Sequence, residues 1–203
     1  MSADFWNSRY AESGYAYGTE PNAFLVSQKQ YLRPSGTVLA VADGEGRNGV
    51  WLAQQGLAVL SVDASEVGLC KAQELAADRG VTIRTEKVDL TTWQWPGQKF
   101  DVVVSIYAHF PPEVRARMHR RMFETLKPGG ILILEAFTPA QLNYQSGGPP
   151  VVEMLYTVDM LRIDFAGGEI LLLEDAITEL AEGKYHRGPA AVVRLVLRRP
   201  GMD

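Results

Sequence analysis

Apolar and polar positions from residue 37 onward fall into regular blocks. Short apolar runs bounded by turn residues predict buried strands, and apolar residues at helical spacing predict helices. The apolar runs lie at about 37–42, 58–63, 100–106 and 131–137, and a further strand is predicted at 81–87. The helical segments lie at about 47–55, 65–78 and 112–126. Strands that alternate with helices in this way predict an α/β protein with a doubly wound, Rossmann-like parallel sheet and helices on both faces.

The pattern changes after residue 137. Residues 139–152 contain a Gly-Gly-Pro-Pro run and predict a loop, and 158–165 predicts a short helix. Two extended runs follow, at about 169–180 and 190–199, joined by residues 181–189. These runs predict a C-terminal antiparallel hairpin, which brings the expected total to seven strands.

The segment before the first strand, residues 3–32, is the most aromatic part of the sequence, and 22–32 predicts a helix. Two interpretations remain open. The segment either caps one edge of the sheet or forms a lid over a ligand. In the second case, Arg9 and Tyr17 would hold a carboxylate and a methionyl group.

The chain has 203 residues, within the range of one domain. We expect an N-terminal cap or lid (1–32), a cofactor-binding core (36–137) and substrate-side loops with the hairpin (138–203). The formal net charge is −4 and basic residues are scattered, which argues against a nucleic acid partner. No signal peptide or membrane-spanning run is visible, and one cysteine suits a reducing cytoplasm. Cys70, in a helical pattern, is expected in the core.

The stretch from Val38 to Asp63 predicts a βαβ unit with a glycine-rich turn at 43–46 and an acid ending the second strand. Glycines allow a ligand to approach the backbone closely, and a carboxylate at this position can accept from both ribose hydroxyls. The unit therefore predicts a site for an adenosine-containing cofactor. GEGRNG at 44–49 is a literal G-x-G-x-x-G, so a nicotinamide dinucleotide and S-adenosylmethionine both fit at this point.

Further motifs follow in a characteristic order: DGEGRN at 43–48, Asp63, Asp89, FDVVVS at 100–105 and LKPGGILIL at 126–134. In this order and spacing the chain resembles the class I S-adenosylmethionine-dependent methyltransferases. YGTEPN at 17–22, GEGRN and the His-Arg pair at 186–187 are similar to small bacterial methyltransferases of the tellurite-resistance type. The resemblance implies five parallel strands followed by an antiparallel hairpin.

The resemblance also implies roles for individual residues in binding S-adenosylmethionine and its product S-adenosylhomocysteine. Gly44 and Gly46 would line the methionine and ribose, Asp63 would hold the ribose hydroxyls, and Asp89 would accept from the adenine amino group. The implied cofactor site is completed by Asp43, Glu45, Asn48, Ala64, Ser65, Leu90, Ser105 and Ile106. The chain departs from the family at Ala40 and Ala42, where an acid and a glycine are common. Asp43 or Glu45 would then replace the missing acid.

Ligands of parallel sheets bind beyond the carboxyl ends of the strands, so residues after the strands are candidates for the acceptor side. The candidate catalytic residues are His109, Tyr156, and the pair His186 and Arg187. Their respective alternatives are a polar residue next to a helix, core packing, and solvation in a loop. His119 is expected on the surface. The histidines share no close spacing with each other or with the cysteine, so no metal site is expected.

The sequence thus predicts methyl transfer to a small-molecule acceptor, such as a thiol or a chalcogen oxyanion, by a monomer or homodimer. Two alternatives remain. GEGRNG favours an NAD-dependent oxidoreductase, against which stand the terminal hairpin, the LKPGG turn and Asp89. Ala40 favours a non-catalytic cofactor-binding protein of the same fold.

Overall fold

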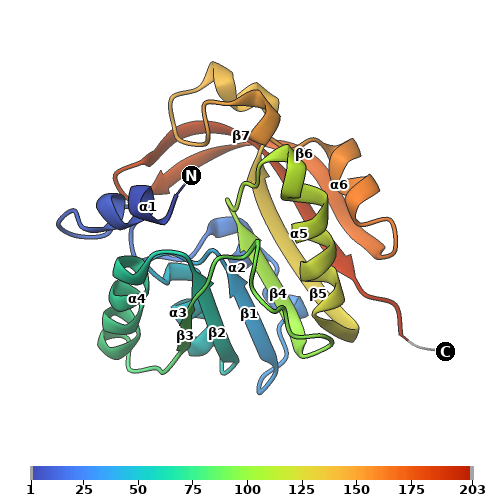
Figure 1. The fold of residues 1–203 in the computed structure, drawn as a ribbon, viewed down its shortest axis with the longest axis horizontal. Helices are drawn as coiled ribbons and strands as arrows, with labels where there is room; N and C mark the ends of the chain where they lie inside the picture. The colour runs from blue at the N-terminus through green and yellow to red at the C-terminus, as the bar shows by residue number, and fades with distance from the viewer. Residues whose placement is uncertain (1, 202–203) are drawn as a thin grey trace. The chain divides into compact units, whose positions relative to one another are not determined.

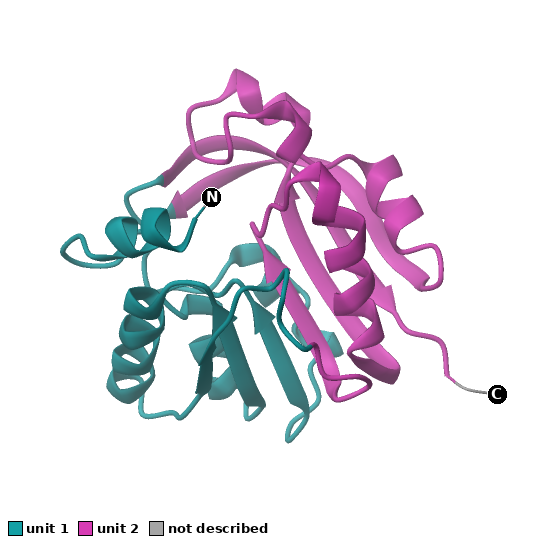
Figure 2. Ribbon diagram, viewed as in Figure 1, with its two compact units in different colours: residues 1–94, 182–185 teal, residues 95–181, 186–203 magenta. Residues whose placement is uncertain are grey.

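The computed structural model describes residues 2–201, which form two compact units. Unit 1 contains residues 1–94 and 182–185, and unit 2 contains residues 95–181 and 186–203 (Figure 2). Each unit is described by itself. In the part of the chain that is described, no helix is long and apolar enough to cross a membrane.

Unit 1 is built on three parallel strands in the order β3-β2-β1 (Figure 1). They span β1 (Thr37–Val41), β2 (Ala58–Asp63) and β3 (Arg84–Lys87), with α3 (Arg47–Gln54) and α4 (Glu66–Asp78) between them. β2 begins and ends as predicted, and Ser65 caps α4 by accepting from the N–H of Gly68 at 3.1 Å. β3 is shorter than predicted, because its pairing with β2 begins only at Leu60 opposite Arg84.

The N-terminal segment of unit 1 holds α1 (Ala3–Tyr10), α2 (Ala23–Ser27) and the 3-10 turn η1 (Lys29–Tyr31). The predicted helix over 22–32 is therefore divided at Gln28, whose backbone leaves the helical region. Residues 182–185 pack in the same unit. Glu182 accepts from Arg47 at 2.9 Å and from Asn22 at 3.1 Å, and Lys184 pairs with Glu12.

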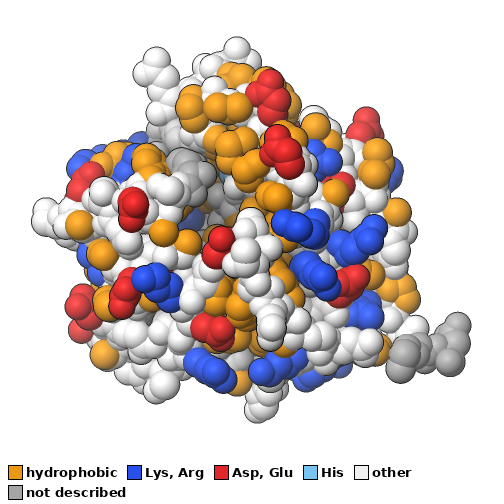
Figure 3. All heavy atoms as spheres, viewed as in Figure 1, with side chains coloured by type: hydrophobic (Ala, Val, Ile, Leu, Met, Phe, Trp, Pro, Cys, Tyr) orange, Lys and Arg blue, Asp and Glu red, His pale blue; other side chains and the backbone are white. Residues whose placement is uncertain are grey.

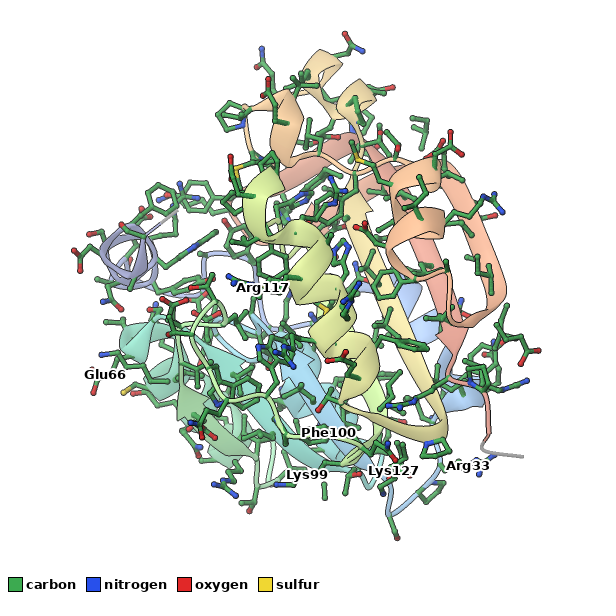
Figure 4. The ribbon with its side chains drawn as sticks, turned by 45° about the vertical axis from the view of Figure 1, so that its right-hand side comes forward. Arg33, Glu66, Lys99, Phe100, Arg117 and Lys127 are labelled. Atoms are coloured by element: carbon green, nitrogen blue, oxygen red, sulfur yellow. The ribbon has the colours of Figure 1, made fainter. Side chains whose placement is uncertain are left out.

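Unit 2 contains β4 (Phe100–Ile106), α5 (Pro112–Glu124) and β5 (Leu126–Phe137), with β4 and β5 parallel. β5 includes the LKPGG run that the sequence predicts as a turn. The register shows why both descriptions hold: Phe100 pairs with Leu126 but Val102 pairs with Ile131, so residues 127–130 bulge out of the ladder. Phe100 and Lys127 mark the starts of the two strands (Figure 4), and Lys127 pairs with Asp101 at 2.8 Å.

The rest of unit 2 holds the 3-10 turns η2 (Pro139–Asn143) and η3 (Val152–Met154), α6 (Val158–Asp164), β6 (Glu169–Glu182) and β7 (His186–Arg198). β7 runs antiparallel to β5, and β6 lies next to β7. The hairpin strands are longer than predicted and leave only residues 183–185 as their connection. His186 and Arg187 therefore begin a strand and do not lie in a loop.

The predicted fold class, parallel strands alternating with helices and followed by an antiparallel hairpin, is confirmed. Two burial predictions are wrong. Cys70 is exposed, because the buried face of α4 carries Gly68, Leu69 and Ala72, and Cys70 lies about 100° round the helix from Leu69. His119 is fully buried, because it shares the inner face of α5 with Met118 and Met122.

Candidate functional site: a cofactor turn in unit 1 and a histidine cluster in unit 2

The glycine-rich turn after β1 needs its glycines for both conformation and space. Gly44 and Gly46 have φ of 56° and 85°, the left-handed region that disfavours other residues. A Cβ on Gly44 would lie 2.5 Å from the Tyr10 hydroxyl, and one on Gly46 would lie 2.5 Å from Ala72 Cβ. Tyr10 and Ala72 thus pack directly against the turn, and neither glycine position has room for a side chain.

Asp63, at the end of β2, is hydrogen-bonded to the glycine-rich turn. Its Oδ2 accepts from Gly44 N at 2.9 Å and its Oδ1 from Ser65 N at 2.8 Å. Burial raises the pKa of Asp63, and the N–H groups of Ser65 and Gly44 oppose that rise. Each carboxylate oxygen has two lone pairs, so both can still accept from a ligand hydroxyl.

The neighbouring polar residues are committed to holding the turn. Asp43 accepts from Ser61 Oγ at 2.7 Å and from Gly49 N, the third residue of α3, at 3.2 Å. It thereby caps a helix whose own cap residue, Gly46, has no side chain. Burial raises the pKa of Asp43 to about 7. Glu45 accepts from Ala16 N at 2.7 Å and pairs with Lys71 at 3.0 Å.

Through these contacts Asp43 and Glu45 stabilise the turn. The contacts do not support the expectation that Asp43 or Glu45 replaces the acid that is missing at Ala40. Asn48 has a similar duty, because its Oδ1 accepts from Asn22 N at 2.9 Å. The turn is therefore held from behind by side chains, while Gly44 faces the buried Tyr10 ring.

The remaining predicted cofactor residues of unit 1 lie after β2 and β3. Ser65 is fully buried and bonds Asn7 at 2.7 Å, and Ala64 lies between it and Asp63. Asp89 is exposed, and its Oδ1 accepts from both the N–H and the hydroxyl of Thr91. These bonds fix the Asp89 carboxyl beside Leu90 and leave its Oδ2 available, as an adenine contact requires.

Arg9 and Tyr17, predicted to hold the methionine end of a cofactor, contact each other. The Arg9 guanidinium donates to the Tyr17 hydroxyl at 3.3 Å and lies 3.8 Å from the centre of the Tyr185 ring. Burial raises the pKa of Tyr17, so its hydroxyl stays protonated. The contact supports a shared role, which remains a prediction.

Ala42, where the related family has glycine, carries a positive φ of 51°. An alanine in this region is strained by about 1–2 kcal/mol. We expect Ala42→Gly to raise the free energy of unfolding by up to about 1 kcal/mol, the relief being partly offset by a more flexible unfolded chain. Urea titration measures it. The matched control is Ala40→Gly, in the middle of buried β1, which should destabilise; equal effects of the two changes would contradict the strain at Ala42.

Unit 2 contains the other predicted residues. Ser105 and Ile106 end β4, and the Ser105 hydroxyl is buried without a hydrogen-bond partner among residues 2–201. Tyr107 follows, with a positive φ of 57°, and donates to Glu135 at 2.8 Å. Glu135 also accepts from Arg194 at 2.6 Å. The sequence did not predict a role for Tyr107, because no neighbouring residue indicates that its backbone adopts a left-handed conformation.

His109 is fixed at both ring nitrogens. Nδ1 lies 2.7 Å from the carbonyl oxygen of Met154, and Nε2 accepts from the N–H of Phe137 at 3.1 Å. This pattern requires a neutral ring with its proton on Nδ1. Burial lowers the pKa of His109 to about 4. The geometry therefore favours a structural role for His109 over proton transfer.

The lowered pKa makes His109 a source of acid sensitivity. Below pH 6.5 the histidine binds a proton in the unfolded chain, whereas in the folded protein it stays neutral until about pH 4. The free energy of unfolding therefore decreases as the pH falls through that window. The loss is about 3 kcal/mol. His109→Gln should be less stable at pH 7 but lose correspondingly less between pH 6.5 and 4. Urea titrations at several pH values measure both slopes, and parallel slopes would show that another group titrates.

Tyr156 is fully buried, which favours the core-packing alternative. Its hydroxyl donates to Ala108 O at 3.2 Å and accepts from Phe110 N at 2.7 Å, and burial raises its pKa. His186 and Arg187 begin β7, where successive side chains point to opposite faces. His186 is buried against Tyr107, with ring centres 4.8 Å apart, whereas Arg187 is exposed. The structure therefore does not bring them together as a pair.

A buried charge network joins α5 to α6. Asp164 accepts from Arg115 Nε at 2.8 Å and lies 2.7 Å from Nδ1 of His119. The His119 ring packs against Tyr156 and Phe165. Burial lowers the pKa of His119, while its hydrogen bond to Asp164 opposes this shift. No group of His, Cys, Asp and Glu among the described residues could hold a metal ion. The absence of a metal site remains a prediction.

The segment between β5 and α6 exposes apolar side chains. Leu142, Val151 and Val152 are 45–49 % exposed, and orange side chains gather over this segment at the top of Figure 3. Exposed apolar groups in a cluster are a common feature of binding surfaces.

Unit 1 is an α/β unit that combines a glycine-rich turn with an acid at the end of a strand. Part of the chain is similar to known methyltransferases. Residues 38–130 match the methyltransferase domain family. The chain is 31 % identical over 121 residues to thiocyanate methyltransferase 1 of Brassica oleracea, covering 58 % of this chain and 52 % of that protein. The chain thus spans about half the length of this relative.

Solved structures share the fold across nearly the whole chain. A protein solved in work on the conversion of a disulfide bond into a thioacetal group during echinomycin biosynthesis has a TM-score of 0.75 and 18 % identity, covering 99 % of this chain and 93 % of that one. TehB from Haemophilus influenzae has a TM-score of 0.71 and 19 % identity, covering 97 % and 66 %. The chain is therefore similar to the methyltransferase domain family over residues 38–130 and shares the fold of these solved structures.

Proposed function

We propose that the protein transfers a methyl group from S-adenosylmethionine to a small acceptor that attacks as an anion, a thiolate or a chalcogen oxyanion. One observation carries the choice of acceptor. His109 is neutral with both ring nitrogens occupied, so the first candidate base cannot readily take a proton. The Tyr156 hydroxyl likewise already donates one hydrogen bond and accepts another. An acceptor that is already anionic needs no base, whereas a hydroxyl or amine acceptor often does.

The residues of unit 1 fit the cofactor. Asp63 keeps acceptor lone pairs for ribose hydroxyls, and Asp89 presents a free carboxylate oxygen. The bound cofactor supplies an electrophilic methyl group on a sulfonium sulfur. The protein's contribution is then to orient the reactants in line and exclude water, and positioning of this kind lowers barriers substantially.

The similarity to a thiocyanate methyltransferase supports a sulfur-centred acceptor, since thiocyanate is a small anion. The fold shared with TehB is compatible with a chalcogen oxyanion. We further infer that the acceptor is the only other partner required, without nucleic acid or membrane, and that the protein works in the cytoplasm as a monomer or homodimer. The single-domain organisation over 1–203 and a lid formed by residues 1–32 belong to the same proposal.

The test is a panel of acceptors, with S-adenosylhomocysteine formation as the readout. Thiocyanate, a thiol, selenite and tellurite should support turnover, while a phenol and a primary amine of similar size should not. With thiocyanate, which stays anionic, the rate should be nearly independent of pH between 6 and 9. Preference for the phenol or the amine would overturn the acceptor assignment. Asp63→Ala should lose turnover with every acceptor, which controls for a cofactor-independent signal.

The two alternatives are distinguished by calorimetric titration of the purified protein with S-adenosylmethionine, S-adenosylhomocysteine and NAD. Binding of the two adenosyl-sulfur ligands without NAD is expected. Binding of NAD alone would favour an oxidoreductase. Binding of the adenosyl-sulfur ligands without turnover across the panel would favour a non-catalytic cofactor-binding protein.

A further inference from the structure

Residues 182–185, the end of β6 and its connection to β7, pack in unit 1, and we call them the hairpin tip (Figure 2). The carboxylate of Glu182 accepts from Arg47 at 2.9 Å and from Asn22 Nδ2 at 3.1 Å. The Arg47 and Glu182 side chains are 8 % and 12 % exposed, so the ion pair is largely shielded from water. Because Arg47 begins α3 directly after the glycine-rich turn, the tip is anchored beside that turn.

The backbone of the hairpin tip fits closely against the N-terminal segment. Gly183 has a positive φ of 67°. A Cβ on Gly183 would lie 2.7 Å from the carbonyl oxygen of Ala16 and would overlap the backbone of Gly18. The N–H of Lys184 donates to the same Ala16 oxygen at 2.9 Å. Glycine is therefore required at position 183, because any side chain there would push the tip away from the segment.

Tyr185, the last residue of the hairpin tip, contacts two of the candidate cofactor residues. Its hydroxyl donates to Glu12 at 2.5 Å, and the Arg9 guanidinium lies 3.8 Å from its ring centre. The centre of the Tyr17 ring is 6.0 Å from that of Tyr185. The tip is thus packed against both residues that the sequence predicts at the methionine end of the cofactor.

The chain enters unit 2 immediately after Tyr185. His186 begins β7 and is buried, with its ring centre 4.8 Å from that of Tyr107 and 5.5 Å from that of Phe137. A single peptide bond therefore joins a residue packed on the cofactor side to a candidate residue of the acceptor side. A tip released from unit 1 would no longer restrain the start of β7.

We propose that the hairpin tip couples the cofactor site to the acceptor-side residues, so that a bound cofactor orders the start of β7. The inference rests on the proposed function and adds a form of regulation to it. The tip has two states, docked with the contacts above or released without them. A ligand shifts such an equilibrium only through a difference in its affinity for the two states. The cofactor has this difference, because the docked tip fixes Arg47 beside the turn and contacts Arg9 and Tyr17.

Hydrogen exchange followed by mass spectrometry tests the coupling, with saturating S-adenosylhomocysteine as the ligand. In the wild-type protein the ligand should slow amide exchange at residues 186–192 about fivefold or more, since coupling factors of roughly 5 to 150 are typical. Glu182→Gln keeps an oxygen for Asn22 but removes the charge that pairs with Arg47. In this variant the ligand should slow exchange at 186–192 less than about twofold. A tip with a purely structural role would change exchange equally with and without the ligand.

Glu179→Gln is the matched control. Glu179 is an exposed acid of β6 that belongs to unit 2, so the variant should keep the wild-type ratio of exchange rates. Tyr185→Phe removes only the hydroxyl bonded to Glu12 and should give an intermediate ratio, and it provides the test if Glu182→Gln does not fold. A wild-type ratio near one, or an unchanged ratio in both tip variants, would overturn the coupling. Failure of the wild-type protein to bind S-adenosylhomocysteine would instead overturn the proposed function.

Discussion

Asp63→Ala is expected to weaken S-adenosylmethionine binding by roughly 100-fold or more, because two charge-assisted hydrogen bonds to ribose hydroxyls are worth about 3 kcal/mol or more together. The structure adds a second reason. Asp63 also holds the N–H groups of Gly44 and Ser65, so its loss releases the turn that lines the cofactor. Calorimetric titration with S-adenosylmethionine gives the affinity directly.

Two controls separate these effects. Asp63→Asn keeps one carbonyl acceptor and should bind with intermediate affinity. Glu66→Ala removes an acid only three positions away, but Glu66 is exposed on the first turn of α4 and pairs with exposed Lys87, so the affinity should hardly change (Figure 4). An Asp63→Ala protein that binds the cofactor as tightly as wild type would refute the ribose assignment.

Asp164→Ala should lower the free energy of unfolding by about 3–5 kcal/mol, the usual result when one member of a buried ion pair is removed. Asp164 is 3 % exposed and is the shared acceptor of Arg115 and His119. Without it, the Arg115 charge and the His119 N–H lose their partner inside unit 2, and α6 loses its link to α5. Urea unfolding at pH 7 measures the change.

Asp159→Ala is the comparison on the same helix. Asp159 is an exposed acid in the first turn of α6, so its removal should cost at most about 1 kcal/mol through the helix dipole. Asp164→Asn, which can still accept one hydrogen bond, should fall between the two. A loss under 1 kcal/mol for Asp164→Ala would mean that the network contributes little to stability.

The sequence predicted the βαβ unit well because its signals are local. The glycine turn, the Ser65 cap and the apolar runs of β1, β2 and β4 each lie within a few residues of the structure they specify. The fold class followed from their order. The ends of elements were less predictable where partners decide them, as in β3, which is strand only where β2 pairs with it.

The acceptor-side residues were harder because their environment comes from distant parts of the chain. His109 meets Met154 and Phe137, and His119 meets Asp164, partners 28 to 45 residues away. A histidine with such partners cannot be distinguished from an exposed one by its neighbours in sequence.

The packing of residues 182–185 within unit 1 constrains how the chain can fold during synthesis. Glu182, 135 residues after Arg47, is the carboxylate of its buried ion pair, and Tyr185 bonds Glu12 across 173 residues. A chain emerging from the ribosome cannot form these contacts until residues 182–185 have been made. Contacts of such long sequence separation form late. The N-terminal segment should therefore stay sensitive to proteases in nascent chains that stop before residue 182.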